Sequence, residues 1–252
     1  RAAGSHEAAG AGEARRVILT RVHPGPPESL ELDAASTRDR LLDLYRPAPS
    51  PTLRLNLVAS ISGSAAGSDG TSDTLTSRVD RRILGVIREL SDVVLVGAAS
   101  VRAEGYQVPQ RARLAAVTAS GDLAGHRIRP DQRESVIVLA PAEARERVLE
   151  SLPGAELIIV PTTGPTVAMN DVVDALHSAG FDSIVCEGGP GLAGQLIAAG
   201  LVDEICLTTS PQLGGVTLPL LATASASRAA SLTQLIVDEQ GYLFARWALR
   251  AP

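Results

Sequence analysis

The sequence contains no lysine and is poor in aromatic residues. All 23 basic residues are arginine, and with 28 acidic residues the formal net charge is −5. The 252 residues include only two phenylalanines, three tyrosines and one tryptophan. An acidic chain with so few rings has neither the basic surface nor the stacking platform of a nucleic-acid-binding protein. We therefore expect no nucleic-acid partner.

Long apolar runs and a cysteine framework are missing as well. The longest stretch without a charge, residues 205–227, holds two prolines and two glycines, and it lacks the roughly 20 continuous apolar residues of a membrane span. The two cysteines, Cys186 and Cys206, lie in apolar runs typical of buried free thiols. Two such thiols suit a reducing compartment, so we expect a cytoplasmic protein with no membrane partner.

The length allows one large domain or two small ones. Residues 1–14 are small and polar, and we predict a disordered tail in which Gly4-Ser-His resembles a tag remnant. Residues 15–51 are predicted to form an N-terminal strand (17–22) and a Pro-rich connector with one helix (36–45). Residues 52–252 are predicted to form one domain.

Within that domain, strand and helix patterns alternate. One helix shows apolar residues at helical spacing, namely Val79, Ile83, Val86, Ile87 and Leu90. The last two strands flank a glycine turn at residues 239–241 and are predicted to form an antiparallel hairpin. The pattern predicts a three-layer α/β domain whose sheet is mainly parallel, with an antiparallel C-terminal hairpin. The predicted strands cover residues 53–59, 92–96, 114–118, 135–139, 156–160, 183–186, 203–209, 232–238 and 242–249; the predicted helices cover 77–90, a short piece from residue 99, 141–152, 170–179 and 191–199.

A glycine-rich turn is the sharpest local feature: Ser183-Ile-Val-Cys-Glu187-Gly-Gly-Pro-Gly-Leu-Ala-Gly-Gln195. Residues 189–194 read G-x-G-x-x-G, and glycines before a helix N-terminus let backbone N–H groups approach an anion. In the ordinary dinucleotide fold this turn follows the first strand, and an acid lies about 20 residues later. Here it follows a late strand and residues 211–215 contain no acid, so a tight turn without a ligand stays an alternative.

Glu187 ends the buried strand before this turn. The carboxyl edge of an α/β sheet is where such proteins bind ligands, and a carboxylate there suits hydrogen bonds to an amino-heterocycle. The alternative is a surface carboxylate that caps the turn.

Several sequence blocks, in this order, resemble the reductase domain of riboflavin biosynthesis over about residues 52–248. The blocks are Leu57-Val-Ala-Ser, Gly70-Thr-Ser, residues 92–104, Glu187-Gly-Gly-Pro, Leu192-Ala-Gly, residues 200–205 and Ser210-Pro-Gln-Leu-Gly-Gly. The resemblance implies a dihydrofolate-reductase-like fold, NADPH as cofactor and a homodimer. It also implies an activity, the reduction of the ribosyl side chain of 5-amino-6-(5-phosphoribosylamino)uracil to the ribityl form.

The resemblance also implies site residues. On the substrate side it points to Ser72, Arg88 and Glu187. Arg88 can fork onto phosphate or carboxylate oxygens, although it could also be a solvated helix arginine. Glu187 is the catalytic candidate because reduction needs a proton source, for which a bound water is the alternative. The predicted cofactor-binding residues are Val58, Thr74, Ser100, Glu104, Gly189, Pro190, Gly191, Leu192, Ala193, Gly194 and Gln195.

Two departures from the family pattern keep other functions open. Ser62 replaces the acid of the family's Ser-Leu-Asp-Gly, and residues 104–107 replace its Asp-Asp-Pro, with Arg111 or Arg113 as the arginine that follows. A dihydrofolate or pterin reductase of the same fold, or a catalytically silent nucleotide-binding dimer, are therefore alternatives. The H-x-E and P-C-x-x-C motifs of a zinc deaminase are absent from the sequence, and we expect no metal site.

Overall fold

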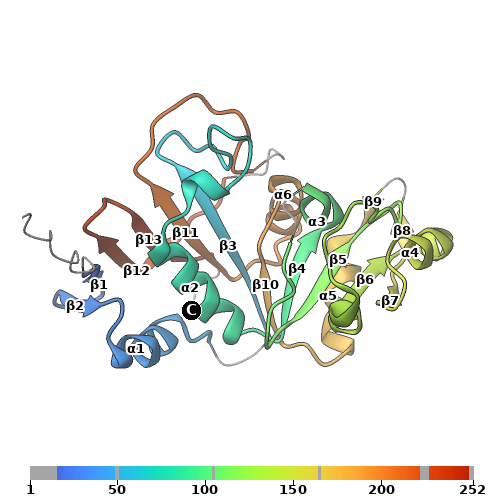
Figure 1. Ribbon diagram of the computed structural model, residues 1–252, viewed down its shortest axis with the longest axis horizontal. Helices are drawn as coiled ribbons and strands as arrows, with labels where there is room; N and C mark the ends of the chain where they lie inside the picture. The colour runs from blue at the N-terminus through green and yellow to red at the C-terminus, as the bar shows by residue number, and fades with distance from the viewer. Residues whose placement is uncertain (1–15, 49–50, 104–105, 164–165, 222–226, 250–252) are drawn as a thin grey trace, which may run out of the picture.

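The computed structural model describes residues 16–48, 51–103, 106–163, 166–221 and 227–249. Its centre is an eleven-stranded sheet with the order β2-β1-β12-β13-β11-β3-β10-β4-β5-β6-β7 (Figure 1). The strands are β1 (Ile18–His23), β2 (Glu28–Glu31), β3 (Thr52–Ser60), β4 (Val93–Gly97), β5 (Arg113–Val117), β6 (Val136–Ala140), β7 (Glu156–Ile159), β10 (Ser183–Cys186), β11 (Glu204–Ser210), β12 (Ser231–Asp238) and β13 (Leu243–Ala248).

Strand direction divides the sheet into two parts. From β7 across to β11 neighbouring strands are parallel, whereas β13, β12, β1 and β2 add antiparallel strands beyond β11. The predicted α/β fold with a mainly parallel sheet and an antiparallel C-terminal hairpin is confirmed. A separate two-stranded piece pairs β8 (Thr162–Thr163) with β9 (Thr166–Val167).

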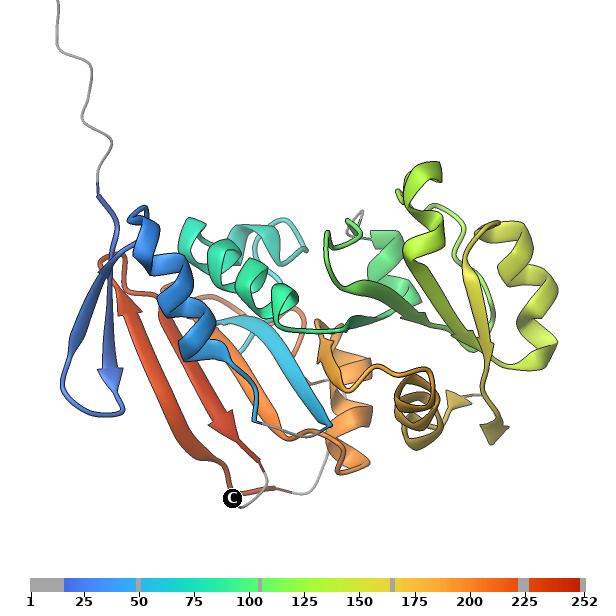
Figure 2. The same ribbon diagram turned by 90° about the horizontal axis from the view of Figure 1, so that it is seen from below.

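Helices cover both faces of the sheet and make three layers (Figure 2). In β4, Val94 and Val96 pack into one core cluster and Val93 and Leu95 into the other, because successive side chains of a strand point to opposite faces. The first cluster takes residues from α1 (Ala35–Tyr45), α2 (Arg78–Glu89), α3 (Ala98–Ala103) and α4 (Arg145–Ser151), and the second from α5 (Met169–Ser178) and α6 (Pro190–Ala198).

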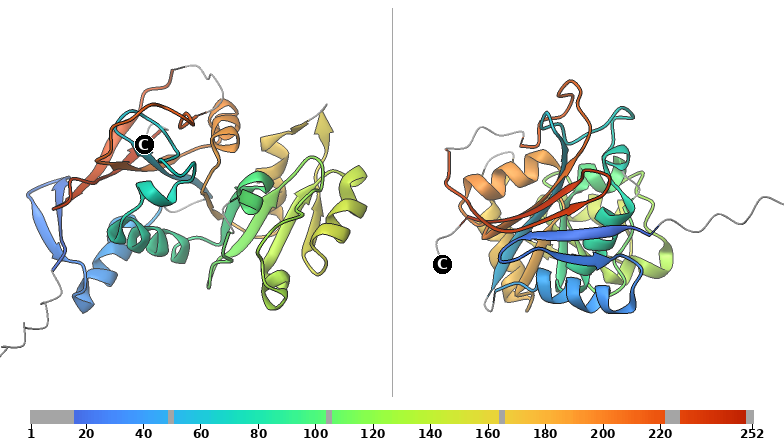
Figure 3. Two further views of the ribbon diagram at one scale, coloured as in Figure 1. Left: turned by 45° about the horizontal axis from the view of Figure 1, so that its top comes forward. Right: turned by 90° about the vertical axis from the view of Figure 1, so that its left-hand side faces the viewer.

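The N-terminal segment contains a strand that the sequence pattern misses. Residues of the predicted connector form β2, which pairs with β1, and β1 in turn pairs with β12 (Figure 3). The sequence of β2, Glu-Ser-Leu-Glu, has no apolar alternation because it is an edge strand with acids at both ends. The sheet therefore includes strands from both sides of the boundary predicted at residue 52.

Elsewhere the helix patterns match closely. The helix predicted for residues 141–152 divides into a 3₁₀ turn, η3 (Ala142–Ala144), and α4. Two further 3₁₀ turns, η1 (Asp73–Leu75) and η2 (Pro130–Ser135), lie outside the predicted helices. Among the described residues no helix is both long and apolar enough to cross a bilayer.

Candidate functional site

The carboxyl ends of four neighbouring parallel strands, β11, β3, β10 and β4, meet at one edge of the sheet. The loop 61–76 follows β3, α3 follows β4, and the glycine turn and α6 follow β10. These segments lie together at the top of Figure 1. Residues far apart in the sequence thus meet at the edge where α/β proteins bind ligands.

The glycine turn is braced against α3. The Gly189 N–H group donates to Ser100 Oγ at 3.2 Å, and the Gly97 N–H group donates to the Gly188 carbonyl at 3.3 Å. Gly188 has φ of +101°, a conformation that favours glycine. Two predicted cofactor-site elements, Ser100 and the 189–195 turn, are therefore in direct contact.

The first turn of α6 is open on its outer side. A Cβ atom built on Gly191 would meet nothing within 4 Å, whereas one on Gly189 would lie 3.3 Å from Ser100 Oγ. Gly189 is the N-cap and Pro190 takes the first helical position, where its missing N–H costs nothing. The N–H groups of Gly191 and Leu192 make no hydrogen bond to any described residue. This geometry suits a phosphate held by backbone N–H groups and the positive helix end.

Arg88 and Glu187 form a buried, two-pronged ion pair. Arg88 Nε donates to Glu187 Oε1 at 2.7 Å and Arg88 Nη2 donates to Oε2 at 2.6 Å. The Glu187 side chain is only 6% exposed and that of Arg88 is 23% exposed. Arg88 also donates to the Tyr106 hydroxyl at 3.1 Å and lies over the ring of Tyr106 at 5.3 Å. Neither residue is a solvated surface group. The predicted fork of Arg88 onto carboxylate oxygens is made with Glu187.

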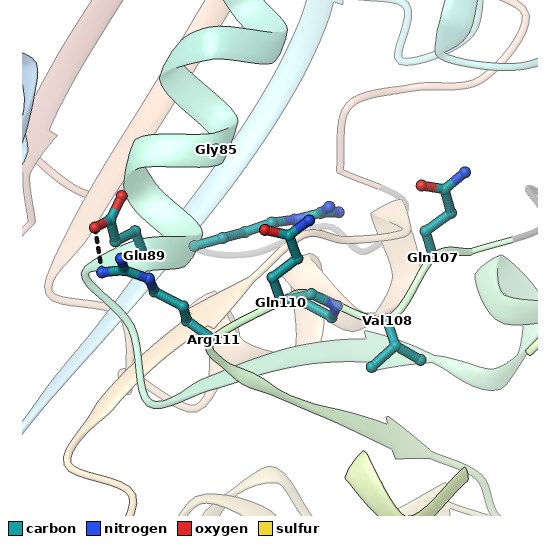
Figure 4. Close-up of a pocket in the computed structure, with 8 residues that line it drawn as sticks. Gly85, Glu89, Gln107, Val108, Gln110 and Arg111 are labelled. Carbon is teal, nitrogen blue, oxygen red and sulfur yellow. Dashed lines mark hydrogen bonds and ion pairs between the residues drawn. The ribbon is translucent and has the colours of Figure 1, made fainter. Parts of the chain in front are cut away.

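A pocket of about 250 Å³ opens beside Arg88. Residues 107–111 face the C-terminal half of α2 across this pocket (Figure 4). Arg111 lines it and its Nη1 donates to Glu89 Oε1 at 2.5 Å. Arg113 instead pairs with Glu156 at 2.6 Å. Of the two arginines considered after the family's Asp-Asp-Pro position, Arg111 is the one that lies with Arg88.

Three other predicted residues, Ser72, Thr74 and Val58, lie on β3 or in the loop that follows it. Ser72 precedes η1, and Thr74 Oγ1 donates to Asp69 Oδ1 at 3.1 Å. Val58 lies on β3 beside Thr208 of β11. Within the described part of the chain, no side-chain hydrogen bond joins Ser72, Thr74 or Val58 to the glycine turn or to the ion pair. Glu104 lies outside the described residues. These four assignments, like those of the other site residues, stay predictions.

The hydroxyl of Ser62, the residue expected to stand where the family has an acid, pairs with that of Ser60 at 2.9 Å.

A second buried acid escaped the sequence reasoning. Asp80 of α2 is 8% exposed and Thr208 of β11 is 6% exposed. The Thr208 hydroxyl donates to Asp80 Oδ1 at 2.6 Å. Burial raises the pKa of the Asp80 carboxyl above its ordinary 3.8, while the Thr208 hydrogen bond opposes this rise. In the sequence Asp80 follows Ser77 by three residues, a spacing typical of an exposed helix cap. The sequence pattern therefore does not predict that the Asp80 carboxylate is buried.

Comparison with known proteins places the chain in the class of α/β pyrimidine reductases. The chain belongs to the RibD C-terminal domain family, whose model matches residues 51–241. The predicted relation to the riboflavin-biosynthesis reductases is therefore confirmed.

Individual relatives agree with this family. Over 175 residues the chain is 26% identical to the 2,5-diamino-6-ribosylamino-4(3H)-pyrimidinone 5′-phosphate reductase of Methanothermobacter thermautotrophicus, covering 66% of this chain and 80% of that protein. It is 30% identical to the riboflavin biosynthesis protein RibD of Mycobacterium tuberculosis over 168 residues, 66% of this chain and 43% of RibD. The chain thus spans less than half the length of that protein.

Solved structures share the architecture. A pyrimidine reductase-like protein from Corynebacterium diphtheriae superposes with a TM-score of 0.67 at 26% identity, covering 80% of this chain and 93% of that one. The deaminase/reductase of Thermotoga maritima gives a TM-score of 0.64 at 18% identity, covering 80% of this chain and 57% of that one, and shares the fold.

Proposed function

We propose that the protein is an NADPH-dependent reductase that converts the ribosyl side chain of a phosphorylated ribosylaminopyrimidine to the ribityl form. The observation that carries this proposal is the adjacency of two features. A buried carboxylate, Glu187, is fixed by Arg88, and the open glycine turn begins at the next residue. In this proposal Glu187 holds the polar heterocycle of the substrate, and the glycine turn holds the phosphates of the cofactor.

The cofactor assignment rests on the first turn of α6. Unpaired N–H groups of Gly191 and Leu192, an N-terminal dipole and the open face of Gly191 suit a pyrophosphate. Ser100 fixes the turn through Gly189. When bound, NADPH would supply the hydride, while the chain's own residues orient the reactants and exclude water.

Glu187 is the proposed anchor of the substrate ring. Each carboxylate oxygen has two lone pairs, and Arg88 occupies one on each oxygen, so both oxygens can still accept from an amino or ring N–H group. We keep Glu187 as the predicted catalytic residue, although this pairing favours anchoring over proton donation. Arg111, Gln107 and Gln110 of the adjacent pocket offer donors for the substrate's phosphate.

Two substrates fit this proposal. The resemblance predicts 5-amino-6-(5-phosphoribosylamino)uracil, and the M. thermautotrophicus relative is named for the 2,5-diamino-pyrimidinone. The two rings differ at C2, which carries oxygen in the first and an amino group in the second. We also propose that the enzyme acts as a homodimer, which light scattering on the purified protein would test.

The experiment follows NADPH oxidation by absorbance with either phosphorylated substrate, and NADPH binding by fluorescence. Gly191→Asp should weaken NADPH binding at least tenfold because it adds a negative charge where the phosphates lie. Gly191→Asn is the matched control of equal size without charge, and it should weaken binding less. Unchanged affinity in Gly191→Asp would remove the phosphate assignment.

Other outcomes would favour the alternatives. Turnover of dihydrofolate alone would indicate a pterin reductase. Tight NADPH binding without turnover of any of these substrates would indicate a silent nucleotide-binding protein.

A further inference from the structure

Asp80 is a buried carboxylate that the proposed mechanism does not yet use. It lies in the first turn of α2, the helix whose last turn carries Arg88. It packs against the same face of the sheet as Glu187, and the Glu187 charge acts on it. Burying a carboxylate costs free energy unless partners compensate for the lost water, so the partners of Asp80 need to be identified.

Helix capping does not use this carboxylate. Ser77 Oγ accepts from the Asp80 backbone N–H at 3.1 Å, which is half of a capping box. In the other half the acid would bond back to the N-cap N–H group. Here the carboxylate accepts from Thr208 instead, so it turns toward the sheet.

Charge pairing does not use it either. Glu187 is held by Arg88, and the half-buried Glu204 is held by Arg54 at 2.6 Å and Arg246 at 2.5 Å. Asp80 forms no ion pair with any described residue, and its Oδ2 accepts no hydrogen bond from one. Among the described residues, its side-chain hydrogen bond comes from the neutral hydroxyl of Thr208. An acceptor with free lone pairs therefore lies on the helix that also carries Arg88, the partner of the ring anchor.

Strand register places one further polar side chain, Asn56, on the sheet face that carries the two acids. Thr208 and Cys206 of β11 lie beside Val58 and Asn56 of β3, and β10 follows next to β3. Asn56 alternates with Leu55 and Leu57, which face α6, so it lies on the α2 side. It is half-buried, and its amide makes no hydrogen bond within the described part of the chain. The α2 face of the central strands thus offers a polar side chain that is available to a ligand.

Resting on the proposed function, we propose that Asp80, oriented by Thr208, binds the C2–N3 edge of the pyrimidine and selects the 2-amino ring over the 2-oxo ring. A carboxylate only accepts hydrogen bonds. The 2-amino-4-oxopyrimidine presents two parallel donors there, the amino group and N3–H. The uracil ring presents one donor and a carbonyl oxygen, which would face the carboxylate lone pairs without a donor.

The groups around Asp80 set its charge. The positive end of α2 and Arg81 favour the carboxylate, whereas burial and Glu187 favour the neutral acid. A bound pair of N–H donors would itself stabilise the carboxylate. The 2-amino ring and the ionised form therefore support each other.

The test compares kcat/KM for the two phosphorylated substrates in the wild type, Asp80→Asn, Thr208→Val and Thr208→Ser. The wild type should prefer the 2-amino substrate by about 10- to 100-fold, the discrimination that one bidentate pair provides. Asp80→Asn should reverse the preference, because an amide offers one donor and one acceptor to the uracil edge. Thr208→Val should reduce the preference and Thr208→Ser should keep it. The exposed acid in Asp174→Asn serves as control.

A binding measurement separates this inference from the proposed function. Isocytosine and uracil present the two edges without ribose or phosphate, and calorimetry or ligand-detected NMR reports their binding. Stronger binding of isocytosine that is lost in Asp80→Asn supports the inference even if neither substrate turns over. Equal preference in the wild type and in a folded Asp80→Asn variant, by either measurement, overturns it. Wild-type preference for uracil also overturns it.

Discussion

Removing the Arg88 guanidinium tests the central ion pair. Arg88→Met keeps an unbranched side chain but loses two charge-assisted bonds to Glu187 and the bond to Tyr106. The main consequence falls on Glu187, which is 6% exposed and would hold a buried charge without a partner. The variant should therefore be destabilised mainly through the residue that it leaves behind.

The structure gives the size of this effect. Breaking a buried ion pair by removing one partner costs about 3–5 kcal/mol, and we expect the lower end, about 3 kcal/mol, because Arg88 is 23% exposed. For a chain of this size that corresponds to a fall of about 6–12 °C in Tm. Glu187→Gln should cost only about 1 kcal/mol, because Arg88 can turn toward solvent. Adding Glu187→Gln to Arg88→Met should recover about 2 kcal/mol, because no buried charge remains.

Urea unfolding of the four proteins, followed by circular dichroism, measures this cycle. Arg82→Met, an exposed arginine on the same helix, should change stability by less than about 0.5 kcal/mol. Both Arg88→Met and Glu187→Gln should lose reductase activity. If the two losses in stability simply add, Glu187 is not a buried charge that depends on Arg88, and the reasoning fails.

Two further predictions concern groups at the edge of the domain and of the pocket. Arg111→Gln should raise KM for a phosphorylated substrate several-fold. It should leave Tm within about 1 °C, because Arg111 is 68% exposed. Equal KM values for the variant and the wild type would show that Arg111 does not bind the phosphate. Glu28 accepts from Arg40 and Arg21, and the Arg40 hydrogen bond in particular lowers the pKa of Glu28 from 4.5 to about 2. A lowered pKa stabilises the fold above pH 4.5 and loses this effect as the pH falls toward about 2, so Glu28→Gln should lower Tm by about 2 °C at pH 7 and much less near pH 2.5. Equal Tm differences at both pH values would contradict this.

Most helices and strands could be predicted from the sequence because their side-chain pattern matches their burial. The strands β4 and β6 are continuous aliphatic runs buried on both faces, and α2 has apolar residues at helical spacing. The strand β2 could not be predicted, because it is held by β1 and by ion pairs of Glu28 rather than by a buried apolar face. Its stability comes from residues that are distant along the chain.

The same distinction separates the predicted part of the site from the missed part. The glycine turn is local, so 13 consecutive residues are enough to predict its backbone conformation. The Arg88–Glu187 pair joins residues 99 apart, and the family resemblance could name both but not their contact. The Asp80–Thr208 bond joins residues 128 apart, one of which has the sequence pattern of a helix cap.

What brings these residues together is the order of the sheet rather than any motif. The strand β3 lies between β10 and β11 in the sheet, although it is the first parallel strand along the chain and they are the last two. Once they are adjacent, the α2-facing residues of each form one surface, with Arg88 and Asp80 from α2 lying against it. The substrate is therefore expected to contact several strands at once. Replacing a polar residue that faces α2, as in Thr208→Val, should therefore change the preference between the two pyrimidine edges, whereas the glycine turn should stay folded.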